Sequence, residues 1–140
     1  MGKRIYVVLN GKAGKAGSQG PEQAKAVIEE GFRKADPGTE IDFGFTQAPM
    51  HAAELARDAA KSGKYYAVCA AGGDGTVNEV VNGMVNTGVP MGVLPWGSGN
   101  VFSQEMSINN QIDEACKLVL NGTPRVVDTG KVGDRHYIWM

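Results

Sequence analysis

The residues best suited to chemistry in this sequence form a glycine-rich turn with one acid. The turn reads Gly72-Gly73-Asp74-Gly75-Thr76 and joins a run of small apolar residues to a helical pattern. Glycines let backbone N–H groups approach an anion, and the N-terminus of the following helix adds oriented donors. Asp74 cannot bind phosphate directly, so its carboxylate is predicted to face a cation, a hydroxyl or an amide. The turn therefore predicts a phosphate site with one acid available for metal or proton chemistry.

Helix capping offers a structural alternative for the same turn. Aspartate is a favourable N-cap residue, and Thr76-Val77-Asn78-Glu79 has the spacing of a capping box by itself. If Thr76 and Glu79 cap the helix, Asp74 is not needed for that purpose. Its carboxylate is then available to bind magnesium through water, to bind a ribose hydroxyl or to accept a proton. The sequence leaves the structural and the ligand-binding interpretation open.

Three further loops are predicted at the ends of strands, and two of them are also rich in glycine. They cover Asn10–Gly17, Thr46–Pro49 and Pro95–Asn100. In a parallel α/β sheet the strand-to-helix loops meet at one edge, where ligands bind. Three glycine-rich loops at one edge favour a binding site over a set of merely tight turns. We therefore expect a phosphate-bearing ligand, held by backbone amides, at the carboxyl ends of the strands.

The elements that must position these loops alternate along the chain. Short β-branched apolar runs alternate with longer helical patterns, which is typical of an α/β fold with three αβα layers and a mostly parallel sheet. The predicted strands cover Arg4–Leu9, Glu40–Thr46, Tyr66–Ala71 and Met91–Leu94. The predicted helices cover Pro21–Ala35, Met50–Ser62, Thr76–Asn86 and Ile112–Asn121, with a short helical turn near Val101–Met106. A hairpin is predicted about Gly133-Asp134.

The third predicted helix has the clearest periodicity. Its apolar residues recur at the spacing i, i+3, i+4, i+7, i+8, which places them on one face of a helix. These residues are Val77, Val80, Val81, Met84 and Val85. We expect this face to pack against the sheet.

Composition places the chain among ordinary globular domains. It has 140 residues, of which 42% are hydrophobic and 21% charged, so one domain with a buried core is expected. The net charge of −1 argues against a nucleic-acid partner. Cys69 and Cys116 are predicted to be buried free thiols. No stretch is long enough to cross a bilayer, so we expect a cytoplasmic domain, with binding at the inner face of a membrane left open.

The stretch GGDGTVNEVVNG, residues 72–83, resembles the diacylglycerol kinase catalytic-domain family. That family includes bacterial lipid kinases, sphingosine kinases and ceramide kinases. GGDGT alone is shared with the distantly related NAD kinases and phosphofructokinases, whereas the extended stretch is much narrower. Further similar motifs are Asn10 with its glycine loop, Thr46, LPWGSGN at 94–100 and VVDTGKV at 126–132. The resemblance thus spans nearly the whole chain and implies the nucleotide-binding fold of NAD kinase and phosphofructokinase.

The resemblance also implies cofactors and roles for individual residues. A member of this family binds ATP and Mg²⁺ and transfers the γ-phosphoryl group to a lipid hydroxyl. By similarity, the nucleotide would be bound by Asn10, Gly11, Lys12, Thr46, Gly72, Gly73, Gly75, Thr76, Glu79, Gly97, Ser98 and Asn100. Asp74 would be the catalytic residue, and Asp74 and Asp128 would hold the metal. For Asp128 the alternative of a hairpin-pairing residue stays open.

The resemblance further implies a division of labour between domains. Residues 1–140 would form the ATP-binding catalytic domain, and a β-rich C-terminal domain that this chain lacks would hold the lipid. The partner would be a lipid substrate at the membrane surface, reached through that missing domain. This chain alone is expected to be poorly active. Its oligomeric state is left open, with a homodimer as one option.

Two positions depart from the family pattern. The first loop commonly begins Asn-Pro and continues through Ser-Gly, whereas this chain has NGKAG at 10–14. A hydroxyl is lost there, and Lys12 or Lys15 would compensate electrostatically. Bacterial diacylglycerol kinases often have Asp directly after the last loop asparagine, where this chain has Val101. The acceptor therefore stays open between a diacylglycerol-like and a sphingoid lipid. The rival functions are a regulatory nucleotide-binding module without kinase activity and a kinase of a soluble acceptor such as NAD.

Overall fold

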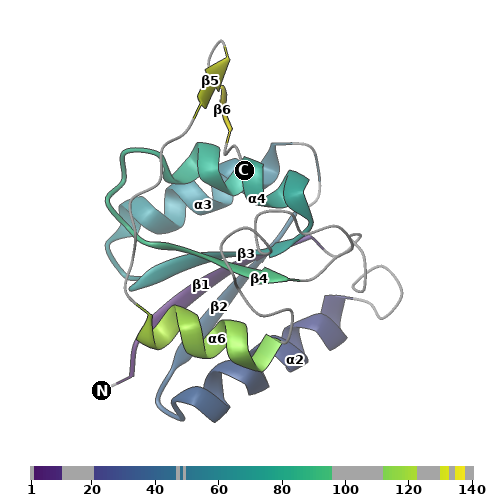
Figure 1. Ribbon diagram of the computed structural model, residues 1–140, viewed down its shortest axis with the longest axis vertical. Coiled ribbons are helices and arrows are strands. Elements are labelled where there is room, and N and C mark those ends of the chain that lie inside the picture. Colours follow the sequence, from purple (N-terminus) through teal and green to yellow (C-terminus); the bar gives the residue numbers. More distant parts are fainter. Residues whose placement is uncertain are drawn as a thin grey trace.

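A four-stranded parallel sheet forms the centre of the molecule (Figure 1). The computed structural model describes residues 2–10, 21–46, 48, 50–95, 112–122, 130–132 and 135–137. The strands are β1 (Arg4–Leu9), β2 (Glu40–Phe45), β3 (Ala67–Gly72) and β4 (Met91–Pro95), in the spatial order β2-β1-β3-β4. The helices are α2 (Pro21–Ala35), α3 (His51–Ser62), α4 (Asp74–Met84) and α6 (Ile112–Asn121). Strands β5 (Gly130–Val132) and β6 (Arg135–Tyr137) form an antiparallel hairpin.

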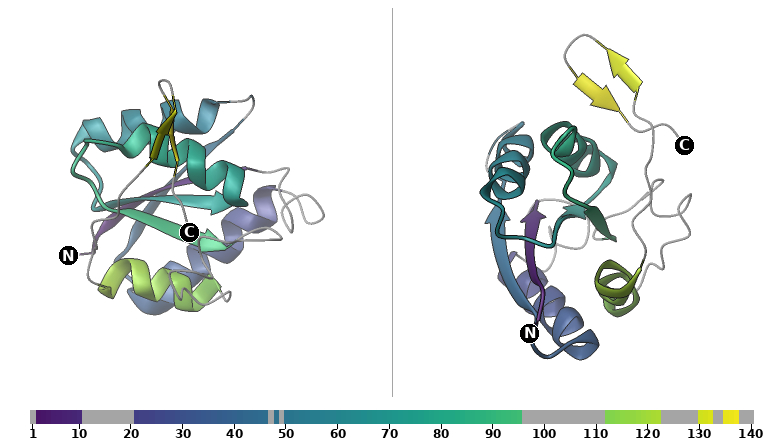
Figure 2. Two further views of the ribbon diagram at one scale, coloured as in Figure 1. Left: turned by 45° about the horizontal axis from the view of Figure 1, so that its top comes forward. Right: turned by 90° about the vertical axis from the view of Figure 1, so that its left-hand side faces the viewer.

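Helices cover both faces of the sheet, which gives three layers (Figure 2). Successive residues of a strand point to opposite faces, so Val7 of β1 lies in the core with α2 and α6, whereas Val8 lies in the core with α3 and α4. Phe32 of α2 is fully buried in the first of these cores. The predicted fold class, a mostly parallel sheet in three αβα layers, is confirmed.

Strand β3 is buried along its whole length because it lies between β1 and β4 and under helices on both faces. Its sequence, AVCAAG, is a continuous run of small residues without polar alternation, as expected for a strand covered on both faces. Cys69 of β3 and Cys116 of α6 are both buried and free, as predicted. Burial raises the pKa of the Cys116 thiol to about 12, so at neutral pH it is the protonated, unreactive form.

Helix α4 presents its predicted apolar face to the sheet. Val77, Val80, Val81 and Met84 are all buried against it, and Val85, directly after the helix, is partly buried. The helix begins and ends two residues earlier than the predicted range of 76–86. The periodicity of the valines therefore identified the buried face correctly but not the ends of the helix.

Gly83 permits close contact between α4 and α3. A Cβ atom at this position would lie 2.3 Å from the carbonyl oxygen of Ala53 and 3.0 Å from the Cβ of Ala56. The nearer atom belongs to the backbone of α3, so even a methyl group would push the helices apart. The last glycine of the GGDGTVNEVVNG stretch is thus needed for packing, and the alanine-rich face of α3 matches it.

The other predicted elements agree closely with the structure. β1, α2 and α6 have the predicted bounds, and the remaining strands and α3 differ by single residues. In the predicted hairpin, Val132 is opposite Arg135, as a turn at residues 133 and 134 requires. The short helical turn predicted near Val101–Met106 lies outside the described residues. None of the helices in the described part of the chain is long and apolar enough to span a bilayer.

Candidate functional site

The carboxyl ends of the four parallel strands lie at one edge of the sheet (Figure 1). β1 and β3 are neighbours in the middle of this edge. The chain leaves β1 for α2 on one face of the sheet and leaves β3 for α4 on the opposite face. Such a reversal of direction is a topological switch point, the place where open α/β sheets bind ligands. Asn10, which follows β1, and Gly73, which follows β3, lie on the two sides of this switch point.

Helix α4 begins at this switch point without a side-chain cap. Gly73 is its N-cap, in an extended conformation with φ −84° and ψ −172°, and no side chain there accepts a capping hydrogen bond. The N–H of Val77 donates to the carbonyl oxygen of Gly73 at 3.1 Å and closes the first helical turn. The N–H groups of Asp74, Gly75 and Thr76 precede that bond, at the positive end of the helix dipole. The start of α4 therefore offers three backbone donors to an anion.

The structural alternative, in which Thr76 and Glu79 form a capping box, is wrong. The helix starts at Asp74, so Thr76 already lies inside the first turn and cannot be its N-cap. Asp74 is not the N-cap either, because Gly73 occupies that position. Glycine is itself an accepted N-cap residue but has no capping side chain, so the helix begins two residues before the Thr76–Glu79 pattern without a side-chain signal. Glu79 is half-buried further along α4.

Gly73 and Gly75 have open space where a side chain would stand. A Cβ atom built on either residue meets no atom within 4 Å. Gly75 is exposed, and Gly73 is half-buried. Nothing in the described structure requires these two residues to be glycine for packing. Their lack of side chains instead leaves the backbone N–H groups of the first turn accessible.

Gly72 differs from its two neighbours. A Cβ atom here would lie 2.7 Å from Thr76 Oγ1 and 2.9 Å from Thr76 Cβ. The threonine side chain therefore folds back over the α-carbon of Gly72, which must lack a side chain to accommodate it. The three glycines of the turn therefore differ. Gly72 makes room for the side chain of Thr76, whereas Gly73 and Gly75 face open space.

The starts of the loops after β1 and β2 are fixed by backbone hydrogen bonds. The N–H of Asn10 donates to the carbonyl oxygen of Ala71 at 3.2 Å, and the N–H of Thr46 donates to that of Leu9 at 3.1 Å. These bonds continue the pairing of the sheet one step beyond the strand ends. In addition, Asn10 Nδ2 donates to Thr76 Oγ1 at 3.4 Å. The structure thus brings Asn10, Thr76 and the start of α4 together, as the predicted site requires.

Several predicted site residues lie outside the described part of the chain. They are Gly11, Lys12, Gly97, Ser98, Asn100 and Asp128, together with the side chain of Asp74. Among the described residues, no group of three or more His, Cys, Asp or Glu side chains forms a metal site. The nucleotide, catalytic and metal-binding roles given to all these positions stay predictions.

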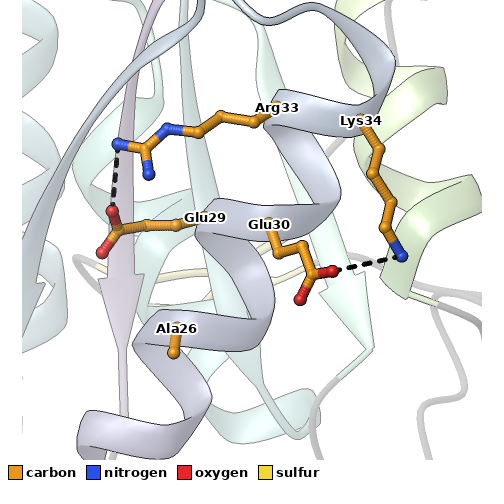
Figure 3. A pocket seen from close by; sticks show the side chains of 5 residues that line it. All are labelled: Ala26, Glu29, Glu30, Arg33 and Lys34. Atoms are coloured by element: carbon orange, nitrogen blue, oxygen red, sulfur yellow. Dashed lines mark ion pairs between the residues drawn. The ribbon is translucent and has the colours of Figure 1, made fainter.

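A hollow on α2 offers no competing site (Figure 3). Its lining residues all belong to this one helix: Ala26, Glu29, Glu30, Arg33 and Lys34. Arg33 pairs with Glu29 at 3.2 Å, and Lys34 pairs with Glu30 at 3.5 Å. These charges neutralise one another at the i,i+4 spacing of a solvated helix face. The hollow therefore presents no uncompensated charge to a ligand.

Sequence reasoning missed the contact between Asn10 and Thr76. The two residues are 66 positions apart, and neither has a spacing or pattern that points to the other. Strand order brings them together, because β1 and β3 pair side by side. Only the strand order could have predicted this contact, and residue spacing does not reveal it.

Comparisons with known proteins agree with this fold. The model of the family described as "Diacylglycerol kinase catalytic domain" matches residues 4–132. A Chromohalobacter salexigens protein named "Probable lipid kinase YegS-like" is 35% identical over 137 residues, which is 95% of this chain and 41% of the relative. A Staphylococcus aureus protein named "Diacylglycerol kinase" is 31% identical over 140 residues, which is 99% of this chain and 42% of the relative.

A solved structure shows the same similarity. The crystal structure of a diacylglycerol kinase from Bacillus anthracis matches with a TM-score of 0.75 and 26% identity, over 96% of this chain and 45% of that one. The chain thus spans about two fifths of the length of the curated relatives it matches. The family match covers the whole four-stranded sheet and the turn at the start of α4. The chain belongs to the diacylglycerol kinase catalytic domain family.

Proposed function

We propose that this chain is the nucleotide-binding domain of an ATP-dependent lipid kinase, which transfers the γ-phosphoryl group of ATP to a lipid hydroxyl. Membership of the family and the names of its relatives support a lipid kinase. The observation that carries the proposal is the uncapped first turn of α4, open at Gly73 and Gly75, at the switch point of the sheet. A polyphosphate is the ligand that this arrangement fits best.

The residues of the first turn act by positioning and by charge stabilisation. The N–H groups of Asp74, Gly75 and Thr76 donate to phosphate oxygens, and the helix dipole favours the negative charge there. The side-chain amide of Asn10 borders the same site from β1. A phosphoryl transfer needs little covalent chemistry from the protein, so holding the phosphates in line with the acceptor is the main task of these groups. Asp74 is the residue we propose to receive the acceptor proton.

The donor set also fits magnesium. When bound, Mg²⁺ neutralises charge on the phosphates. This ion is usually held by one or two carboxylates together with substrate phosphates and waters, and not by a cage of protein ligands. Asp74 and Asp128 are the two acids predicted to hold it by similarity to the family. We propose that the ion would arrive with the nucleotide, held mainly by its phosphates.

Nucleotide binding is tested by titrating the complete protein with Mg·ATP in a calorimeter, as wild type and as Gly75→Val. The valine side chain would occupy the open space in front of the first turn, so we expect at least about 100-fold weaker binding. Ala26→Val is the matched control, because it adds the same kind of side chain at an exposed helical position on α2, away from the strand ends. Equal binding by wild type and Gly75→Val, or no binding by either, would contradict the proposed site.

The acceptor is tested on the complete protein with γ-labelled ATP and three separate acceptors: diacylglycerol, a sphingoid base and NAD. We propose that the lipid is presented at a membrane surface by a further domain outside this chain, so mixed micelles are the appropriate substrate form. Label in a lipid product is the expected result. Label in NAD alone would show a soluble acceptor, and nucleotide binding without any labelled product would favour a regulatory module.

A further inference from the structure

The side chain of Thr76 is directed inward, away from the proposed ligand site. Only 5% of this residue is exposed, although it lies in the first turn of a helix whose neighbouring position, Gly75, is exposed. A Cβ atom built on Gly72 would lie 2.7 Å from the Oγ1 of Thr76 and 2.9 Å from its Cβ, which leaves no room for a side chain at Gly72. A hydroxyl in this place has little access to a phosphate outside the helix.

The hydroxyl of Thr76 has a partner on another strand end. Asn10 Nδ2 donates to Thr76 Oγ1 at 3.4 Å, which is long for such a bond. The backbone of Asn10 is fixed independently, because its N–H donates to the carbonyl oxygen of Ala71. With the backbone held by the sheet, the side-chain bond to Thr76 contributes to the direction in which the Asn10 amide points. The two residues join the loop after β1 to the first turn of α4, across the switch point.

We propose that Thr76 is a positioning residue: its hydroxyl orients the Asn10 amide toward the nucleotide and does not itself contact the phosphates. Gly72 belongs to the same device, because its missing side chain lets the threonine fold back. The backbone N–H of Thr76 still faces the ligand with those of the first turn. The inference rests on the proposed nucleotide site and assigns a different role to the threonine side chain within it.

A double-mutant cycle on the complete protein tests the proposal, with Mg·ATP affinity measured by calorimetry. Asn10→Ala removes the oriented amide and is expected to weaken binding about tenfold, and Thr76→Val removes the hydroxyl at nearly constant volume and is expected to weaken it about fivefold. If Thr76 acts only through Asn10, the double variant binds as Asn10→Ala does, within about twofold. Thr76→Ser, which keeps the hydroxyl, is expected to recover most of the affinity lost in Thr76→Val.

Thr39 supplies the matched control. It is the other buried polar residue in the described part of the chain, 4% exposed, and its Oγ1 has no hydrogen-bond partner. Thr39→Val therefore removes a buried hydroxyl with no link to the site, and Mg·ATP affinity should stay within about twofold of wild type. Thermal unfolding of each variant, followed by circular dichroism, checks that it is folded. If Thr76→Val does not fold, Thr76→Ala takes its place in the cycle.

Three results would overturn the proposal while wild type binds Mg·ATP. One is a double variant weakened by about the product of the single effects, roughly fiftyfold, which would show that the threonine contacts the nucleotide independently. The second is an unchanged affinity in Asn10→Ala, and the third is a Thr76→Ser variant as weak as Thr76→Val. Absence of binding by wild type would instead contradict the proposed function itself, so the two failures are distinguishable.

Discussion

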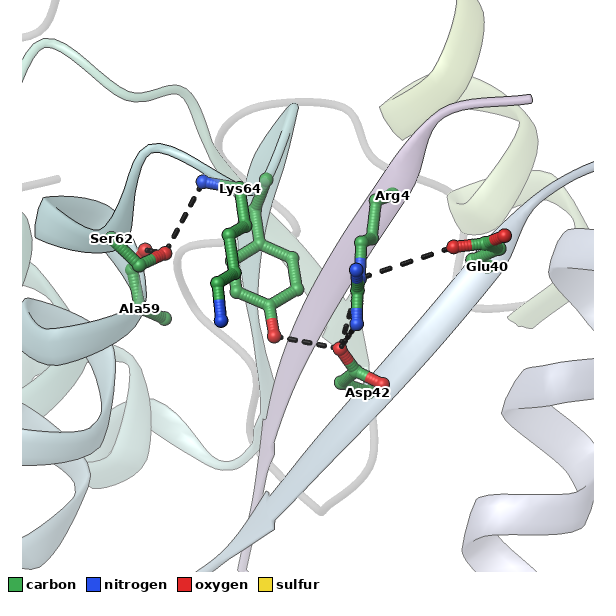
Figure 4. A network of polar contacts seen from close by, with 7 residues as sticks. Arg4, Glu40, Asp42, Ala59, Ser62 and Lys64 are labelled. Atoms are coloured by element: carbon green, nitrogen blue, oxygen red, sulfur yellow. Dashed lines mark hydrogen bonds and ion pairs between the residues drawn. The ribbon is translucent and has the colours of Figure 1, made fainter. Parts of the chain in front are cut away.

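The two edges of the sheet are built on different principles. At the edge where the strands begin, side chains bond to one another: Arg4 Nη2 lies 2.9 Å from Asp42 Oδ2, and the Tyr65 hydroxyl donates to the same oxygen at 2.7 Å (Figure 4). At the edge where the strands end, Gly73 and Gly75 leave backbone donors open. Around Asp42 the amino edge therefore pairs its charged and polar side chains within the protein, whereas the turn at the carboxyl edge has no side chain over its backbone donors at Gly73 and Gly75. Stability and binding are expected to respond to mutation separately.

Asp42 is the centre of the amino-edge network. Its hydrogen bond with the Tyr65 hydroxyl and its pairing with the Arg4 guanidinium hold the pKa of the carboxyl below its usual range, against a smaller opposing effect of burial. Arg4 and Asp42 are both partly exposed, so the ion pair adds less than its short distance suggests. The ring of Tyr65 also packs edge-on against Tyr6 at 5.2 Å between centroids. The network links the starts of β1 and β2 to the segment before β3.

The largest effect is expected within the carboxyl edge itself, where one glycine is structural and its neighbour is not. Gly72→Ala places a Cβ atom 2.7 Å from Thr76 Oγ1, and we expect the free energy of unfolding to fall by about 2 kcal/mol. Gly73→Ala meets no atom within 4 Å and loses only the N-cap preference, so about 0.5 kcal/mol is expected. Urea denaturation followed by circular dichroism measures both. Equal losses would show that the turn is one packed unit and would remove the distinction between these glycines.

A smaller effect on stability, without an effect on binding, is expected at the amino edge. Asp42→Ala leaves the Tyr65 hydroxyl and the Arg4 guanidinium without this acceptor, and the free energy of unfolding should fall by about 1 kcal/mol. Mg·ATP affinity should remain within about twofold of wild type, because Asp42 lies on the strand away from the carboxyl edge. Asp42→Asn, which keeps one oxygen for the tyrosine, should lose less stability. A marked loss of affinity in Asp42→Ala would show that the two edges are coupled.

The smallest effect concerns stability at alkaline pH. Burial, followed by the hydrogen bond to Asp42, raises the pKa of Tyr65 from its ordinary value of 10.0 to about 12. Since the folded state holds this proton more tightly than the unfolded state, the stability it contributes is fully present below about pH 10 and is lost between about pH 10 and 12. Tyr65→Phe should show a flatter decline over that window in urea denaturation. Parallel curves for wild type and Tyr65→Phe would contradict the assigned cause.

Local pattern predicted the elements because each has a short-range cause. Alternating apolar runs and helical periodicity gave the parallel sheet and its helices, and the valines of α4 identified its buried face. The ends of α4 were not predicted, because the polar sequence Thr76-Val77-Asn78-Glu79 imitates a helix start. A glycine N-cap gives no comparable side-chain signal. The start of α4 was therefore predicted wrongly because backbone conformation, and not side-chain type, determines where this helix begins.

By itself, the sequence determined that four glycine- or hydroxyl-bearing loops follow four strands, and that one of them bears the stretch GGDGTVNEVVNG. Only the tertiary structure decided which loops are neighbours, because strand order depends on the packing of whole helices against two faces of the sheet. That order places Asn10 beside Thr76 across 66 residues of chain. Within the turn, the structure also distinguishes Gly72, on which the side chain of Thr76 rests, from Gly73 and Gly75, which face open space. The first result depends on a contact between distant segments and the second on the backbone conformation of the turn, so residue types alone determine neither.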